Sequence, residues 1–189
     1  MDVNMYERAL KTTGEIVAGT KPEQLDDPTP CNEWTVRELL NHMIGGCVTW
    51  AMGAAGEAGD ISPSVDRIGD DHVKAYEEAS RNVLDAFSSS GAMEKNFTMP
   101  WGESPGKANL DVAVSDITVH GCDLAEATGQ EISVDDDIAE ACYQWTTGMM
   151  EPKGSMPRRG AFAEPVEVPD DAPPLDRLLG YLGREPIGS

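Results

Sequence analysis

The chain has 189 residues, of which 40% are hydrophobic, and this is enough for one domain with a sizeable core. It carries 14 Lys and Arg residues against 34 Asp and Glu residues, so its formal net charge is -20. A surface this acidic repels nucleic acids and anionic membranes, and we expect neither as a partner. Residues 1–10 lack the basic and apolar regions of a secretory signal, and no apolar run approaches the length of a membrane span. We therefore expect a cytoplasmic protein with reduced cysteines.

In the first half of the chain, apolar residues recur at steps of three and four, which predicts helices over residues 3–20, 35–51 and 71–88. The second of these begins with a capping box, in which the Thr35 hydroxyl accepts from the Glu38 amide and the Glu38 side chain reaches back. Pro and Gly residues mark three connections, at residues 21–33, 53–70 and 89–107.

The second half continues the same pattern, with helices predicted over residues 109–128, from about 134 to 150, and over 174–182. Gly129 is a natural end for the first of these. Residues 151–173 are rich in Pro and Gly and are expected to form a loop or a lid, with short extended pieces near residues 161–168. Long helices with almost no alternating pattern predict an all-α helical bundle that forms a single domain over residues 1–189.

Asp116 and His120 stand four residues apart in the fourth predicted helix, so they share one face with the apolar residues Ile117 and Leu124. A carboxylate on a core-facing stripe is unfavourable by several kcal/mol unless something compensates it, and a divalent cation is one such compensator. His42 lies at the border of the apolar face of the second helix, so the three side chains converge if the two helices touch. The alternative interpretation is an ion pair between Asp116 and His120, with His42 merely half buried.

Two imidazoles and one carboxylate suit zinc best, and nickel or iron(II) as well. Three protein ligands leave positions open for water or a substrate, which is typical of a catalytic metal site. The sequence therefore predicts one divalent ion held by His42, Asp116 and His120.

Three further residues are candidates for supporting roles. Asp123 follows His120 by three residues and could accept a hydrogen bond from that imidazole, or else be an exposed helix residue. Arg81 could hold a substrate carboxylate, although a lone helical arginine is usually at the surface. Trp101 could line the entrance of the site.

The cysteines are expected to be structural. Cys31 lies in a turn and is predicted to pack below the second helix, and Trp34 is predicted to pack the end of the bundle. Cys47 is on an apolar helix face, and Cys122, two residues beyond His120, points away from the predicted metal.

Several motifs resemble one bacterial family, the DinB-like, mycothiol-dependent maleylpyruvate isomerase N-terminal domain. They are TPCNEWTV at residues 29–36 with LLNH at 39–42, DITVHGCDLA at 116–125 with ATGQ at 127–130, and LDRLLGYLGREP at 175–186. The resemblance covers nearly the whole chain. It implies an up-down four-helix bundle, here with a short C-terminal helix, and a metal triad made by His42, Asp116 and His120.

The resemblance also implies a function. In similar enzymes the metal is thought to bind the sulfur of a low-molecular-weight thiol, so we expect a metal-dependent thiol transferase or isomerase that acts on a small electrophile with mycothiol or a similar thiol. The alternative is a non-catalytic, stress-related protein that binds a metal or a small ligand. Both a monomer and a homodimer are compatible with the sequence.

Overall fold

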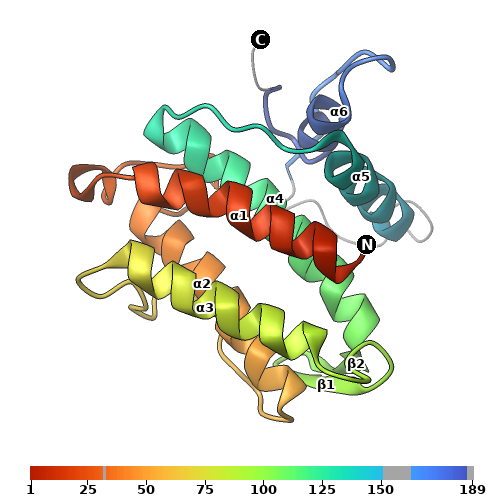
Figure 1. The fold of residues 1–189 in the computed structure, drawn as a ribbon. Coiled ribbons are helices and arrows are strands. Elements are labelled where there is room, and N and C mark those ends of the chain that lie inside the picture. Colours follow the sequence, from red (N-terminus) through yellow and green to blue (C-terminus); the bar gives the residue numbers. More distant parts are fainter. Residues whose placement is uncertain (32, 151–162, 187–189) are drawn as a thin grey trace.

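The computed structural model describes residues 1–31, 33–150 and 163–186. Within them the chain is mostly helical, which confirms the predicted all-α class (Figure 1). The helices are α1 (Val3–Gly19), the 3-10 turn η1 (Pro22–Gln24), α2 (Val36–Ala54), α3 (His72–Ser88), α4 (Gly106–Thr128), α5 (Asp136–Met150) and α6 (Pro174–Tyr181). Two short strands, β1 (Asn96–Met99) and β2 (Gly102–Pro105), lie between α3 and α4.

Helices α1 to α4 form a four-helix bundle in which α1 packs on α3 and α4, and α2 also packs on α3 and α4. Helices α5 and α6 pack on each other and join the bundle through α4, on the side away from α3 (Figure 1). Helix α4 thus contacts α1, α2 and α5. Its side chains are consequently buried around most of its circumference, including the polar ones.

Two predicted helix ends, the start of α2 and the end of α4, agree with the structure because local interactions fix them. Glu38 Oε2 accepts from the Thr35 amide at 2.8 Å, and the Thr35 hydroxyl accepts from the Glu38 amide at 3.4 Å, which confirms the capping box at the start of α2. Helix α4 ends at Gly129, whose φ of 66° lies in the left-handed region that glycine adopts without strain.

The hairpin of β1 and β2 was not predicted, since residues 89–107 were expected to be a loop. The strands are antiparallel, with Asn96 opposite Pro105 and Met99 opposite Gly102. Phe97 and Met99 on β1 are buried, and β1 packs on α2. Four residues per strand are too few for an alternating pattern to stand out from a loop, and the hairpin leads directly into α4, which starts three residues earlier than predicted.

The predicted loop or lid at residues 151–173 falls partly outside the described residues, at 151–162. The described remainder contains neither helix nor strand before Pro174, so the extended pieces expected near residues 161–168 are not strands as far as residues 163–168 show. The Val166 amide donates to the Gly180 carbonyl at 2.9 Å, which attaches this stretch to α6. Across the described chain, none of the helices combines the length and the apolar character needed to cross a bilayer.

Gly121 permits the close packing of α4 on α1. A methyl group at this position would overlap the hydroxyl of Thr13, which is buried and donates to the Ile117 carbonyl at 3.1 Å. A Gly121→Ala variant should therefore lower the free energy of unfolding by about 1–3 kcal/mol, as overpacking does. The matched control is Gly148→Ala in α5, where an added methyl meets nothing within 4 Å and helix propensity alone should add up to about 1 kcal/mol. Urea denaturation followed by circular dichroism measures both, and equal stability of the two variants would contradict the packing argument.

Candidate metal centre

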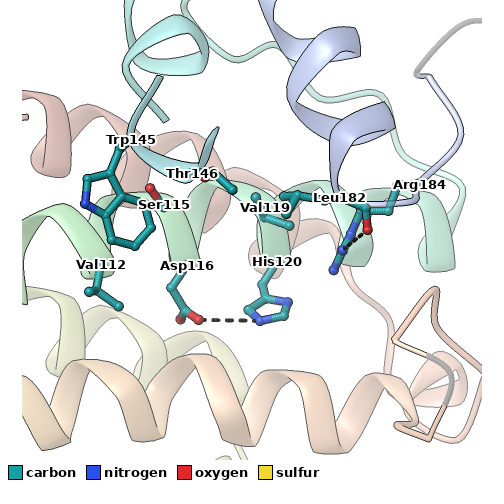
Figure 2. Close-up of a pocket in the computed structure, with 9 residues that line it drawn as sticks. All are labelled: Val112, Ser115, Asp116, Val119, His120, Trp145, Thr146, Leu182 and Arg184. Carbon is teal, nitrogen blue, oxygen red and sulfur yellow. Dashed lines mark hydrogen bonds and ion pairs between the residues drawn. The ribbon is translucent and has the colours of Figure 1, made fainter. Parts of the chain in front are cut away.

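His42, Asp116 and His120 meet where α2 packs on α4. Asp116 and His120 project side by side from α4 toward α2 (Figure 2), and His42 reaches them from α2. Asp116 Oδ1 lies 3.4 Å from His42 Nε2 and 3.5 Å from His120 Nε2. The two imidazole rings are perpendicular to each other with their centroids 4.8 Å apart, and both histidines are buried. The structure therefore brings together the three residues that the sequence singled out.

The spacing of these donor atoms fits a divalent ion. Zinc binds imidazole nitrogen and carboxylate oxygen at about 2.0–2.2 Å in tetrahedral geometry, which places neighbouring donor atoms about 3.3–3.5 Å apart. The two measured separations, 3.4 and 3.5 Å, lie in this range, and all three donor atoms fall within 4.8 Å of one another. The residues thus fit one ion held by three protein ligands.

The charges of the cluster are mutually compensating. Burial raises the pKa of Asp116, but the adjacent His120 and His42 outweigh burial and hold that pKa below its usual value. Burial lowers the pKa of His42, but Asp116 and a backbone hydrogen bond at Ile61 outweigh it, so the pKa of His42 lies above its usual value. The same contacts therefore also satisfy the alternative interpretation of a buried ion pair, in which His42 takes part as closely as His120.

On its other side His120 faces a second buried carboxylate. His120 Nδ1 lies 2.9 Å from Asp123 Oδ2, and Asp123 is only 1% exposed, so the alternative of an exposed helix residue is wrong. Arg184, in the stretch after α6, donates from Nε to Asp123 Oδ1 at 2.8 Å and from Nη2 to Oδ2 at 2.9 Å. Burial raises the pKa of Asp123, but the hydrogen bonds from Arg184 and His120 outweigh it and hold the pKa of this carboxyl well below its usual range.

A second group of possible ligands shares His120. The donor atoms of Cys31, His120 and Asp123 also lie within 4.8 Å of one another, with Cys31 Sγ 3.1 Å from Asp123 Oδ2. Burial raises the pKa of the Cys31 thiol far above its usual value, which disfavours the thiolate that a metal needs. The guanidinium of Arg184 adds a positive charge on this side. The His42 side of His120 is therefore the better candidate for a metal site.

Two residues lie closer to the site than the sequence indicated. Trp34 was predicted to pack the end of the bundle. The centroid of its ring lies 4.6 Å from that of the His42 ring and 5.8 Å from that of the His120 ring. Cys31, predicted to pack below the second helix, contacts Asp123 on α4 instead. The only local signal was that both belong to a motif immediately before α2, and Arg184 gave no signal apart from its place in the C-terminal motif.

Arg81 and Trp101 are not brought to the triad. Arg81 is exposed on α3, which packs on α1 and α2 and is separated from α4 by them. Trp101 is 55% exposed in the turn between β1 and β2 and is not among the residues that line the cavity beside the triad.

A cavity of about 110 Å³ opens beside the triad, between α4, α5 and the stretch after α6 (Figure 2). Asp116 and His120 form part of its wall. The rest of the wall is mostly apolar, and its lining residues are Val112, Ser115, Val119, Trp145, Thr146, Leu182 and Arg184. A small molecule in this cavity would lie directly against two of the three candidate ligands.

These features define a helical-bundle protein with a His–Asp–His cluster whose spacing could accommodate a divalent ion. The sequence pattern of the family described as the mycothiol maleylpyruvate isomerase N-terminal domain matches residues 6–125, and the chain belongs to this family. Two proteins of Mycobacterium tuberculosis, from strains CDC 1551 and H37Rv, are each 31% identical over 182 residues, which is 95% of both chains, and both are described as uncharacterized. No solved structure gives a significant match.

The cysteines are buried and free, and we predict that they are unreactive in the native protein. Burial raises the pKa of Cys47 to about 12 and also raises the pKa values of Cys31, Cys122 and Cys142. Ellman's reagent should therefore label the folded protein at a rate limited by opening of the fold, and the unfolded protein should yield all 4 thiols at once. A thiol that reacts rapidly in the folded protein would show that one cysteine is polarised and accessible.

Proposed function

We propose that this protein binds one divalent metal ion through His42, Asp116 and His120, and that it is a metal-dependent thiol transferase or isomerase acting on a small electrophile with a mycothiol-type thiol. One observation supports this above all: three donor atoms lie at ligand spacing, two of their residues line a cavity, and the chain belongs to the mycothiol maleylpyruvate isomerase N-terminal domain family. Zinc is the first choice for the ion, and nickel or iron(II) would suit the same donors.

Each residue of the centre has a defined task in this proposal. His42 and His120 offer their Nε2 atoms, and Asp116 supplies an oxygen and one negative charge toward the ion. The Trp34 ring lies beside both imidazoles, where it limits access of water. Three protein ligands leave room for one exogenous donor.

When bound, a divalent ion at this position would lower the pKa of a coordinated thiol and so favour the thiolate nucleophile. The chain itself would hold the electrophile in the cavity, whose walls Val112, Val119 and Leu182 exclude water. A cavity of about 110 Å³ is sized for a small electrophile or part of one, so the bulk of a mycothiol-sized thiol would lie outside it. The protein's own cysteines are buried and do not supply the nucleophile.

The second candidate is a non-catalytic protein that binds a metal or a small ligand. One observation favours it: among the described lining residues, the titratable ones are Asp116, His120 and Arg184, and all three are engaged in ion pairs. A general acid or base with no other task is therefore not among the described lining residues, and a binding role needs none.

Metal content tests the part that both candidates share. Protein purified without a histidine tag should hold about one ion per chain, and His42→Ala and His120→Ala should each lose it while keeping the helical circular-dichroism signal. His72→Ala is the matched control, because the third histidine lies on α3 and its Nε2 contacts the Thr20 carbonyl at 3.2 Å, away from the site. Wild-type protein without metal, even after reconstitution with zinc, nickel and iron(II), would leave the buried ion pair as the correct interpretation.

A thiol titration distinguishes the two candidates. Cobalt-substituted protein should develop a thiolate-to-metal absorption band when mycothiol or a simple analogue is added, and the loaded protein should then turn over members of a panel of small electrophiles. His120→Ala is expected to show neither the band nor turnover. Saturable metal binding with no spectral response to thiols would instead support the non-catalytic protein.

A further inference from the structure

The Asp123 carboxylate is held by side chains from three separate parts of the chain. It accepts twice from Arg184, at 2.8 and 2.9 Å, and it contacts Cys31 Sγ at 3.1 Å and His120 Nδ1 at 2.9 Å. An ionised carboxylate offers about four lone-pair positions. Three of the four contacts fall on Oδ2 and one on Oδ1, so the oxygen that faces Cys31 and His120 has no position left for a metal ion.

The Asp123 carboxylate orients His120. An ionised carboxylate is an acceptor only, so the proton of this hydrogen bond lies on His120 Nδ1. The other ring nitrogen, Nε2, is the atom that faces Asp116 at 3.5 Å. The orientation of this imidazole therefore follows from its contact with Asp123.

Arg184 holds that carboxylate in place. It supplies two of the four contacts to Asp123, it is 8% exposed, and its Nη2 also lies 3.9 Å from Cys31 Sγ. Without it, no guanidinium would face Cys31 and Asp123, which together with His120 are the donors of the competing group.

We propose that Arg184 is a positioning residue of the metal centre: by holding Asp123 with two hydrogen bonds, it makes His120 present Nε2 to the His42 side, and its guanidinium closes the Cys31 side to cations. The metal part of this inference rests on the proposed function, whereas the tautomer of His120 does not. Arg184 lies 61 residues beyond Asp123 and outside the stretch that matches the family.

Zinc affinity measures the effect of Arg184 on the centre. Competition with a chromophoric chelator should show zinc binding weakened 10- to 100-fold in Arg184→Met, the range typical for loss of a group that orients a metal ligand. Arg184→Lys keeps the charge but loses the paired hydrogen bonds, so it should fall between wild type and Arg184→Met. The matched control is Arg177→Met, which removes the ion pair of α6 with Glu140 on α5 and touches no histidine. Its affinity should equal that of wild type.

A double variant shows whether Arg184 acts through Asp123. Asp123→Asn alone should weaken zinc binding, and adding Arg184→Met to it should weaken binding little further, because the carboxylate that Arg184 positions is already gone. Independent and fully additive losses would overturn the proposal, and so would Arg184→Met binding zinc as tightly as wild type.

Nitrogen NMR of metal-free protein gives a readout that needs no metal. His120 should carry its proton on Nδ1 in wild type and in Arg177→Met, and Arg184→Met should show a substantial share of the other tautomer. A wild-type ring that is protonated on Nε2 and not on Nδ1 would overturn the inference, as would a cobalt–thiolate band from Cys31 in wild-type protein without added thiol. If wild type binds no metal yet shows the Nδ1 tautomer and its loss in Arg184→Met, the proposed function fails and the positioning of His120 by Arg184 stands.

Discussion

Two carboxylates of α4 that lie on either side of His120, Asp116 and Asp123, impose the constraint on which the rest of the structure depends. Burying an ionised carboxylate is unfavourable by several kcal/mol unless charge and hydrogen bonds compensate it. Asp116 is compensated by His42 on α2, and Asp123 by Arg184 in the stretch after α6. His120 lies between the two and contacts both, through Nε2 and Nδ1. One helix thus requires partners from both ends of the chain.

The local parts of this arrangement were visible in the sequence. The apolar period located the helices, the Thr35–Glu38 capping box and Gly129 marked two of their ends, and the spacing of Asp116 and His120 placed both on one face. The hairpin was not predicted, because strands of four residues are too short to show a clear alternation of apolar and polar residues. The role of Arg184 was not predicted for a different reason. Arg184 and Asp123 are 61 residues apart in the sequence, and the spacing rules for helices and strands say nothing about contacts at that separation.

Membership of the family supports the fold and the choice of candidate ligands, whereas the proposed chemistry rests on the geometry of the centre. The family match covers α4 to Ala125 and contains the three candidate ligands, whereas the two similar proteins of Mycobacterium tuberculosis are described only as uncharacterized. A fold accommodates many functions, so the chemistry has to be argued from the site. In this chain that argument comes from donor spacing, from the cavity beside Asp116 and His120, and from the exclusion of Cys31 as a ligand.

The position of Arg184 in the chain also sets the order in which the centre is built during synthesis. The three candidate ligands and Asp123 all leave the ribosome before it, and at 5–20 residues per second the intervening 61 residues take roughly 3–12 s to make. Through that interval Asp123 and Cys31 lack the guanidinium that later covers them. A nascent chain would therefore expose Asp123 and Cys31 in a way that the finished protein does not, until the stretch after α6 docks against α4.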